Sequence, residues 1–189
     1  EDKSPQKRAK KIDALLETPA YAAWWTTKLC DFTGNNEFQL NNVLPQVRGQ
    51  RGKASQAWYD WIHKRVRENA SYDKLVEGIV TATSRNPGQS YTEYCEEMSA
   101  MLRGDEGTSF AERDSMPFYW ARRNYRQPQP RAINFAYAFL GIRIQCAQCH
   151  KHPFDQWSKQ DFQRFTGFFR QATIANVNNL NQIMRQRPQ

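Results

Sequence analysis

Residues 131–150 read RAINFAYAFLGIRIQCAQCH, and this stretch decides the architecture that we expect. Phe135, Phe139 and Ile142 recur at intervals of four and three residues, which is the spacing of one face of an α-helix. The stretch ends in Cys-x-x-Cys-His at 146–150. We therefore predict a helix that runs to the motif and carries it at its end, in the C-terminal third of the chain.

Signals for further helices precede and follow this stretch. Thr18-Pro19 predicts an N-cap followed by proline at the first helical position, in a helix that stops near Gly34. Ser90 and Glu93 have the spacing of a capping box. Apolar residues at helical spacing mark the stretches Ile12–Leu16, Tyr21–Leu29, Trp58–Val66, Leu75–Val80, Tyr94–Leu102 and Phe162–Phe169. No stretch alternates with a period of two, so we predict an all-α, irregular multi-helix bundle with long loops.

The size of the chain predicts one domain. At about 150 residues per domain, 189 residues correspond to a single unit. With 11 Phe, 8 Tyr and 6 Trp, the chain has enough aromatic residues to fill a core. We expect a helical domain over residues 1–175 and a polar tail or linker, rich in Asn, Gln and Arg, over residues 176–189. Residues 34–54 read as a surface loop and Gln127–Pro130 as a stiff connector.

Membrane insertion is not expected for this segment. No apolar run approaches the roughly 18 residues that span a bilayer. The first eight residues, EDKSPQKR, are too charged for the apolar region of a signal peptide. If the protein is exported, the chain is thus a mature form or an excised domain.

The net charge of +8 is distributed unevenly. Residues 1–120 hold 16 basic and 17 acidic side chains, whereas residues 121–189 hold 11 basic and 2 acidic ones. A basic surface could meet nucleic acid, but no nucleic-acid-reading motif accompanies it and no Lys/Arg run in residues 121–189 exceeds two. We expect no nucleic-acid binding. The basic residues of this part of the chain either form a solvent-exposed face or surround a small anionic ligand.

Cys146, Cys149 and His150 form the attachment signature of c-type haem. The spacing allows two thiols to add to the two haem vinyl groups, and the imidazole that follows can reach the iron. The residues leave alternatives open: a redox dithiol, a disulfide within the motif, or a zinc site that uses Cys146, Cys149, His152 and one further ligand. We favour haem c, with the two cysteines as thioether anchors and His150 as the proximal ligand.

Residues 134–169 resemble the planctomycete cytochrome-c-like domain, which occurs in large exported multidomain proteins. The positions shared with its motif are Cys146, Cys149, His150, His152, Phe154, Asp155, Trp157, Ser158, Asp161, Phe162, Phe168 and Phe169. The resemblance extends to residues 12–25, 58–62 and 72–76, and so covers nearly the whole chain. It implies haem and iron binding, export to the periplasm or beyond, and flanking domains in a larger chain.

A haem at this site would need a sixth ligand to its iron, on the distal side, and cationic partners for its propionates. Distal candidates are Met116, next Met98 and Met101, then His63 and His152. Asp155 could orient an imidazole or instead cap the turn before Trp157. Arginines that could pair with the propionates or with an acidic redox partner are Arg122, Arg123, Arg126, Arg131 and Arg143. Arg143 is the preferred cofactor-binding arginine because it lies three residues before Cys146.

The remaining cysteines, Cys30 and Cys95, either form a disulfide in an oxidising compartment or stay as two free thiols. For the whole chain we expect an electron-transfer module that docks with a redox partner protein, rather than an enzyme. A structural or interaction domain whose cysteines bind zinc or form disulfides is the alternative. A five-coordinate haem would instead make a sensor or a peroxidase-like enzyme possible.

Overall fold

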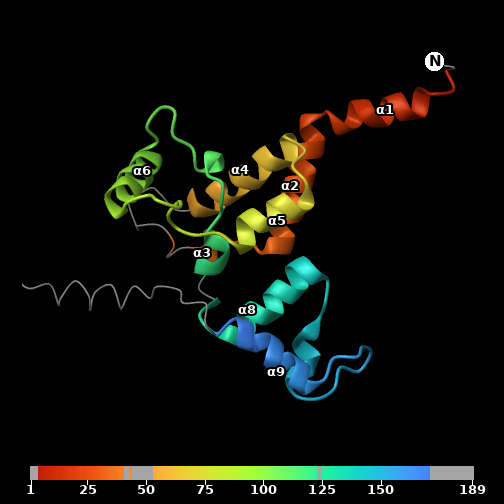
Figure 1. Cartoon of the computed structure of the whole chain (residues 1–189). Helices are drawn as coiled ribbons and strands as arrows, with labels where there is room; N and C mark the ends of the chain where they lie inside the picture. Colours follow the sequence, from red (N-terminus) through yellow and green to blue (C-terminus); the bar gives the residue numbers. More distant parts are fainter. Residues whose placement is uncertain (1–3, 41–42, 44–52, 123–124, 171–189) are drawn as a thin grey trace, which may run out of the picture. The chain divides into compact units, whose positions relative to one another are not determined.

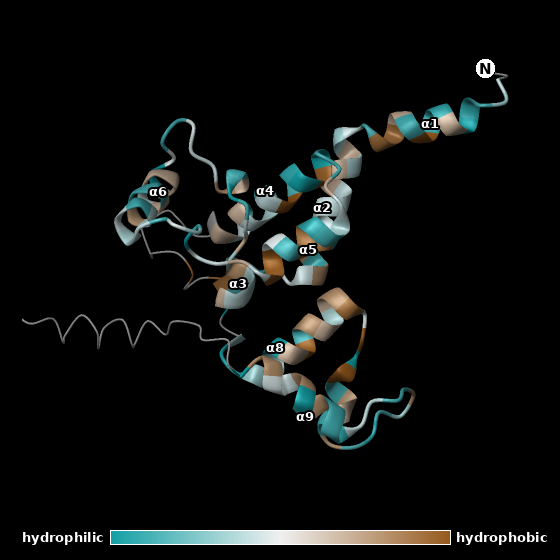
Figure 2. Ribbon diagram, viewed as in Figure 1, coloured by the Kyte–Doolittle hydropathy of each residue, from teal (hydrophilic) through white to brown (hydrophobic). Residues whose placement is uncertain are grey.

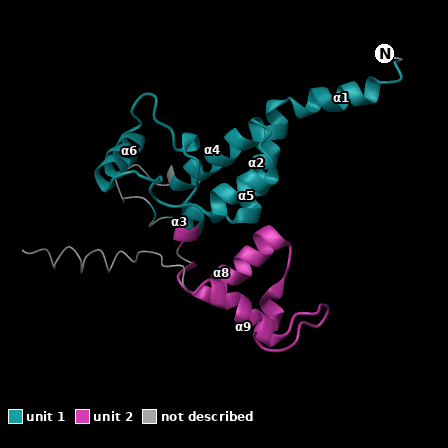
Figure 3. Ribbon diagram, in the orientation of Figure 1, with its two compact units in different colours: residues 1–119 teal, residues 120–189 magenta. Residues whose placement is uncertain are grey.

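All regular secondary structure in the described part of the chain is helical. A computed structural model describes residues 4–40, 43, 53–122 and 125–170, and these residues contain no strand (Figure 1). The predicted all-α class is therefore confirmed. The chain folds as two compact units, residues 1–119 and residues 120–189 (Figure 3), here called unit 1 and unit 2. The predicted tail at 176–189 lies outside the described residues.

Unit 1 holds most of the helices. They are α1 (Lys7–Leu16), α2 (Pro19–Thr33), α3 (Glu37–Leu40), α4 (Lys53–Arg67), α5 (Tyr72–Val80), α6 (Tyr91–Arg103), the short 3-10 helix η1 (Phe110–Glu112) and the start of α7 (Phe118–Ala121). The helices α2 and α4 pack side by side in this unit. Helix α1 has no buried residue and lies at the N-terminal end of the unit. None of the described helices is long and apolar enough to cross a membrane.

Several helix ends follow from single side chains. Helix α2 begins after Thr18, whose hydroxyl accepts a hydrogen bond from the Tyr21 amide at 3.3 Å, and it ends at Gly34 with a left-handed φ of 77°. Helix α6 begins with the predicted capping box: the Glu93 amide donates to the Ser90 hydroxyl at 3.2 Å, and the Ser90 amide donates to the Glu93 carboxylate at 2.8 Å. These caps satisfy backbone groups that a helix cannot pair internally.

The core of unit 1 is built on α4 and α5. Trp58, Trp61 and Ile62 of α4 are completely buried, as is Ile79 of α5. Hydrophobic and hydrophilic residues alternate along the turns of α5 (Figure 2), so one face of this helix is apolar. Gly78 of α5 leaves space for the Trp61 ring of α4, because a Cβ atom at this position would lie 2.9 Å from that ring.

Unit 2 consists of α8 (Pro128–Phe135), the π-helix η3 (Ala136–Leu140), the 3-10 helix η4 (Ile144–Gln148) and α9 (Lys159–Phe168). The expected connector at Gln127–Pro130 is instead the first turn of α8, with proline at the first helical position. A proline fits there because the first amides of a helix have no internal partner. Helix α9 starts with a second capping box, formed by Ser158 and Asp161.

The predicted helix from Arg131 to the motif is interrupted. It ends at Leu140, and Gly141 follows with a left-handed φ of 66°. The Ile142 amide closes this end by donating to the Ala136 carbonyl at 3.0 Å. Glycine is favoured in this conformation because it has no Cβ atom. The motif therefore lies on the separate short helix η4 rather than at the end of the longer helix.

Aromatic rings join the helices of unit 2. The ring of Phe135 lies 5.5 Å from that of Phe169 and stacks on that of Trp120 at 6.3 Å. Phe165 and Phe169 meet edge to face at 5.4 Å. The face of α9 that the sequence predicts as apolar, with Phe162, Phe165 and Phe169, is thus the face that packs inside the unit.

Candidate functional site

The Cys-x-x-Cys-His motif is held on its apolar side. Ile144 and Ala147 of η4 are buried, and they pack with Ala136 and Phe162 in one core cluster. Ala147, one of the two residues between the cysteines, thus anchors the motif on the protein interior. Cys149, which ends η4, is exposed. The two halves of the motif therefore differ: Cys146 and Ala147 are partly or fully buried, whereas Gln148, Cys149 and His150 are exposed.

All four cysteines are free thiols, so neither of the two disulfides considered as alternatives, Cys146–Cys149 or Cys30–Cys95, is formed in this structure. Cys146 is partly buried and Cys149 is exposed. Of the two alternatives for Cys30 and Cys95, the structure has the separate thiols. Cys30 is buried on α2, and this burial raises the pKa of its thiol to about 11.

His150 is exposed, and one nitrogen of its ring is engaged. Its Nδ1 lies 2.6 Å from the Lys151 carbonyl oxygen. A carbonyl oxygen can only accept, so Nδ1 carries the hydrogen and donates it. In the neutral ring Nε2 then carries the lone pair. This is the tautomer that a metal-ligating imidazole uses when its other nitrogen donates to a backbone carbonyl.

His152 is engaged at both ring nitrogens. Its Nδ1 accepts a hydrogen bond from the Phe154 amide at 3.2 Å, so its Nε2 is the donor and bonds to the Arg143 carbonyl at 3.1 Å. The His152 amide donates to the Trp157 carbonyl at 2.8 Å. The residue considered as a possible iron or zinc ligand is thus occupied with backbone groups in this structure.

Asp155 shapes the turn that follows. Its carboxylate accepts from the Gln156 amide at 2.7 Å and from Trp157 Nε1 at 3.0 Å. The sequence allows two roles for Asp155: capping the turn before Trp157, or orienting an imidazole. Its contacts in the structure are those of the turn cap. Phe154 lies 94% exposed in this loop, and residues 151–156 line an open depression.

The arginines proposed to pair with propionates have different environments. Arg143 is exposed, with its guanidinium 5.8 Å from the centroid of the Tyr137 ring. Arg131 is buried and donates to the carbonyls of Tyr125 and Phe169. Arg122 is buried against the Tyr125 ring, at 3.9 Å from its centroid. Arg126 is exposed, and Arg123 lies outside the described residues. Arg143 is therefore an accessible cation next to the motif in sequence.

The distal candidates other than His152 belong to unit 1. Met116 is completely buried there, and its amide donates to the Gly78 carbonyl at 2.9 Å. Met98 and Met101 are partly exposed on α6. His63 stacks on Tyr59 with 5.7 Å between the ring centroids. A distal role for each of them stays a prediction.

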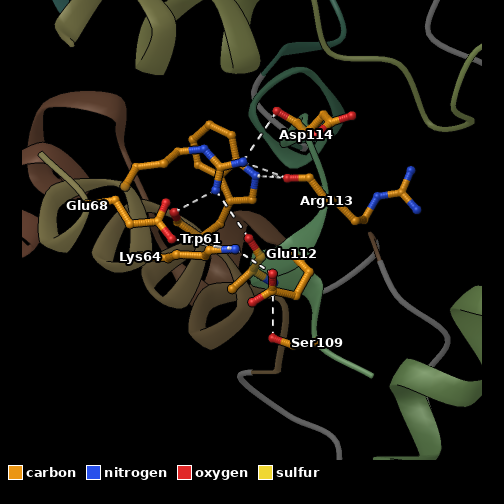
Figure 4. A network of polar contacts seen from close by, with 9 residues as sticks. Trp61, Lys64, Glu68, Ser109, Glu112, Arg113 and Asp114 are labelled. Carbon is orange, nitrogen blue, oxygen red and sulfur yellow. Dashed lines mark hydrogen bonds and ion pairs between the residues drawn. The ribbon is translucent and has the colours of Figure 1, made fainter. Parts of the chain in front are cut away.

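A polar network in unit 1 (Figure 4) was not predicted from the sequence. Trp61 Nε1 donates to the Arg113 carbonyl at 2.8 Å, and the Arg65 guanidinium donates to the same carbonyl at 2.6 Å. The Arg65 guanidinium also stacks over the Trp61 ring at 3.4 Å, and Lys64 pairs with Glu112 and Glu68. These contacts bind α4 to the segment around η1, so the network is structural. Apart from Lys64 and Glu68, its partners are about 50 residues apart, and no local pattern reveals them.

The buried charge of Arg113 strengthens the same region. The Arg113 guanidinium pairs with Glu97 of α6 at 2.5 Å and donates to the Ser84 carbonyl at 2.8 Å. Removing either charge of such a pair leaves its buried partner without compensation. The pair therefore ties α6 and the preceding turn to the rest of unit 1.

Within the described residues, no group of three or more His, Cys, Asp or Glu side chains could hold a metal ion. The zinc set of Cys146, Cys149 and His152 with a fourth residue is thus not assembled there. A haem needs only one imidazole at the iron and two thiols at the ring edge, and these are present in Cys146, Cys149 and His150.

One family model matches the chain. Its description is PSCyt2, protein of unknown function (DUF1549), and the match covers residues 1–174. No curated protein and no solved structure matches the chain. The match extends over residues of both compact units.

Proposed function

Because the chain belongs to the PSCyt2 family of proteins of unknown function (DUF1549), we propose its activity from its own residues: it is a c-type haem-binding module that transfers electrons. Cys146 and Cys149 are the thioether anchors, and His150 is the proximal iron ligand. The bound haem supplies a reversible one-electron change at iron, and the residues of this chain hold it and adjust its potential.

The state of His150 is the observation that carries this proposal. Its Nδ1 donates to the Lys151 carbonyl, and in the neutral ring Nε2 carries the lone pair on an exposed side chain. A backbone acceptor at Nδ1 fixes the tautomer and the orientation of the ring. The imidazole is thus prepared to bind iron without a change of its hydrogen bond.

The two cysteines fit the attachment chemistry. Each thiol adds across one vinyl group: a sulfur–carbon bond forms, the thiol hydrogen goes to the other vinyl carbon, and nothing is oxidised or reduced. The reaction needs reduced thiols, and Cys146 and Cys149 are both free. Burial of Ala147 fixes the backbone between them.

We place the module in the periplasm or another exported compartment, as part of a larger chain, with an acidic redox protein as its partner. The exposed cations of unit 2 fit such a partner: they are Arg126, Arg143, Lys151, Lys159, Arg164 and Arg170. Complementary charge accelerates the encounter of redox proteins.

Covalent attachment of haem tests this proposal. Protein from a host that attaches haem c should keep haem on a denaturing gel and show the mass of one added haem, and the variant Cys146→Ala plus Cys149→Ala should show neither. The matched control, Cys30→Ala plus Cys95→Ala, removes the same number of thiols and should keep haem. Stoichiometric zinc without haem in the wild-type protein would overturn the proposal in favour of the interaction domain.

The coordination state then separates electron transfer from the sensor or peroxidase-like alternative. A six-coordinate, low-spin spectrum supports electron transfer, because the iron then has no open position. A five-coordinate, high-spin spectrum supports the alternative, in which a small ligand or peroxide reaches the iron. Substitution of Met116 by Leu should change the spectrum only if Met116 is the sixth ligand.

A further inference from the structure

His152 connects the two sides of the motif. Its ring bonds to the carbonyl of Arg143, which precedes the motif, and to the amide of Phe154, which follows it. Its own amide bonds to the Trp157 carbonyl. The segment from Arg143 to His152 is therefore a closed loop that contains both cysteines and His150.

The rest of this segment is held unequally. On the N-terminal side, Ile144 and Ala147 are buried in the core of unit 2. On the C-terminal side, residues 149–151 are exposed and belong to no regular helix. The described contacts of Asp155 reach only its neighbours Gln156 and Trp157. The hydrogen bond from His152 to Arg143 thus ties the exposed half of the motif to its buried half.

We propose that His152 is a positioning residue: it closes the motif loop and holds Cys149 and His150 in place before any cofactor arrives. That the positioned groups receive haem rests on the function proposed above, whereas the closed loop is a property of the cofactor-free chain. As an iron ligand, His152 would have to give up its ring bonds to Arg143 and Phe154.

Three substitutions separate the two ring contacts. His152→Gln keeps a donor at about the reach of Nε2 and can still bond to the Arg143 carbonyl. His152→Asn keeps only a short acceptor, suited to the Phe154 amide two residues on. His152→Ala keeps neither. Their ranking therefore shows which contact positions the motif.

The first readout uses haem-free protein and trypsin, which cleaves after the exposed Lys151. Loss of both ring contacts should raise the cleavage rate about tenfold in His152→Ala. The Asn variant should behave like the Ala variant, and the Gln variant should stay close to wild type. Peptides that span residues 147–157 with the same substitutions correct for the preference of trypsin itself. Equal rates in wild type and His152→Ala would overturn the proposal.

The second readout uses haem-loaded protein. The Ala and Asn variants should attach severalfold less haem, the Gln variant should recover the wild-type yield, and the haem that is attached should keep the wild-type spin state. A change of spin state in both the Gln and the Ala variants would make His152 a ligand and overturn the positioning role. If wild-type protein takes no haem, the proposed function fails, and the cleavage rates still decide whether His152 closes the loop.

Discussion

Of the four cysteines, Cys30 is the one that is buried. Burial on α2 raises the pKa of this thiol from 9.0 to about 11, although a hydrogen bond from the Asn35 amide at 3.6 Å opposes the shift. The raised pKa belongs to the folded state, so the contribution of the neutral thiol to stability is complete below about pH 9. It is lost as the pH rises towards 11.

We therefore expect unit 1 to lose about 2 kcal/mol of stability between pH 9 and pH 11 through Cys30. Cys30→Ala should lack this part of the alkaline loss, while the titration of lysines and tyrosines stays common to both proteins. Thermal unfolding of the haem-free proteins at several pH values measures the difference. Parallel pH profiles of wild type and variant would contradict the prediction.

Ala147 is the motif residue with the strictest packing. It is completely buried, whereas its neighbour Gln148 is exposed. Because Ala147 is buried in one cluster with Ile144 and Phe162, we expect the two added methyl groups of Ala147→Val to overpack this cluster and to cost about 1–3 kcal/mol. Gln148→Val places the same side chain in solvent and should change stability by less than about 0.5 kcal/mol. Chemical denaturation of both variants provides the comparison.

Arg143 connects the motif to the charge of the cofactor, if the proposed function holds. Its exposed guanidinium lies next to the motif in sequence, and a nearby positive charge favours the reduced haem. A unit charge at about 10 Å in water contributes about 0.4 kcal/mol, so Arg143→Gln should lower the potential by about 20 mV. Arg170→Gln removes the same charge from the end of α9 and is the control. Equal potentials in Arg143→Gln and wild type would leave Arg143 as a surface residue only.

At the scale of the elements, substitution by alanine should have opposite effects on stability at two helical glycines. A Cβ atom on Gly78 of α5 would lie 2.9 Å from the Trp61 ring and 3.0 Å from the Asp114 carbonyl oxygen, whereas one on Gly167 of α9 would meet nothing within 4 Å. Gly78→Ala should therefore destabilise unit 1 despite the better helix propensity of alanine. Gly167→Ala should stabilise unit 2 by up to about 1 kcal/mol. Stabilisation by both variants, seen in thermal unfolding, would show that Trp61 moves aside.

Helix ends could be predicted where one side chain decides them. Thr18 with Pro19 and Ser90 with Glu93 cap the expected helices, because these contacts span only three residues. Gly141 carried an equally local signal that the prediction missed: a glycine after an apolar stripe favours a left-handed helix end. The proline-rich start of α8 favours a connector by composition, but proline is also favoured in the first turn of a helix, and the structure has the helix.

The reactive groups of the candidate site could be predicted from residue types, but the contacts that hold them in place could not. The spacing of Cys146, Cys149 and His150 identifies the reactive atoms without any tertiary information. The hydrogen bond from His152 to Arg143 depends on the path of the loop between them, which no local rule determines. The contact between Trp61 and Arg113 joins residues 52 positions apart and requires the folded unit.

At the scale of the whole molecule, the charge is concentrated in the C-terminal part. Residues 121–189 hold 11 basic and 2 acidic side chains, and the exposed cations of unit 2 extend from Arg126 to Arg170. Two of its arginines, Arg122 and Arg131, are buried and serve packing instead. An acidic partner would therefore meet the solvent-facing cations of this unit, and the attraction should weaken as salt screens it.

This asymmetry predicts different behaviour for variants with the same net charge. Replacing three exposed arginines of unit 2 by glutamine should lower the salt concentration at which the protein leaves a sulfonate cation exchanger; they are Arg126, Arg164 and Arg170. Replacing three exposed cations of unit 1 by glutamine changes the formal charge equally and should have a smaller effect; they are Lys11, Arg67 and Arg85. The reason is that residues 121–189 hold only 2 acidic side chains against 11 basic ones, whereas residues 1–120 hold 17 acidic and 16 basic ones, so the cations of unit 1 have acidic residues to offset them. Equal elution of the two variants would mean that net charge alone governs retention, and would leave unit 2 without a distinct docking surface.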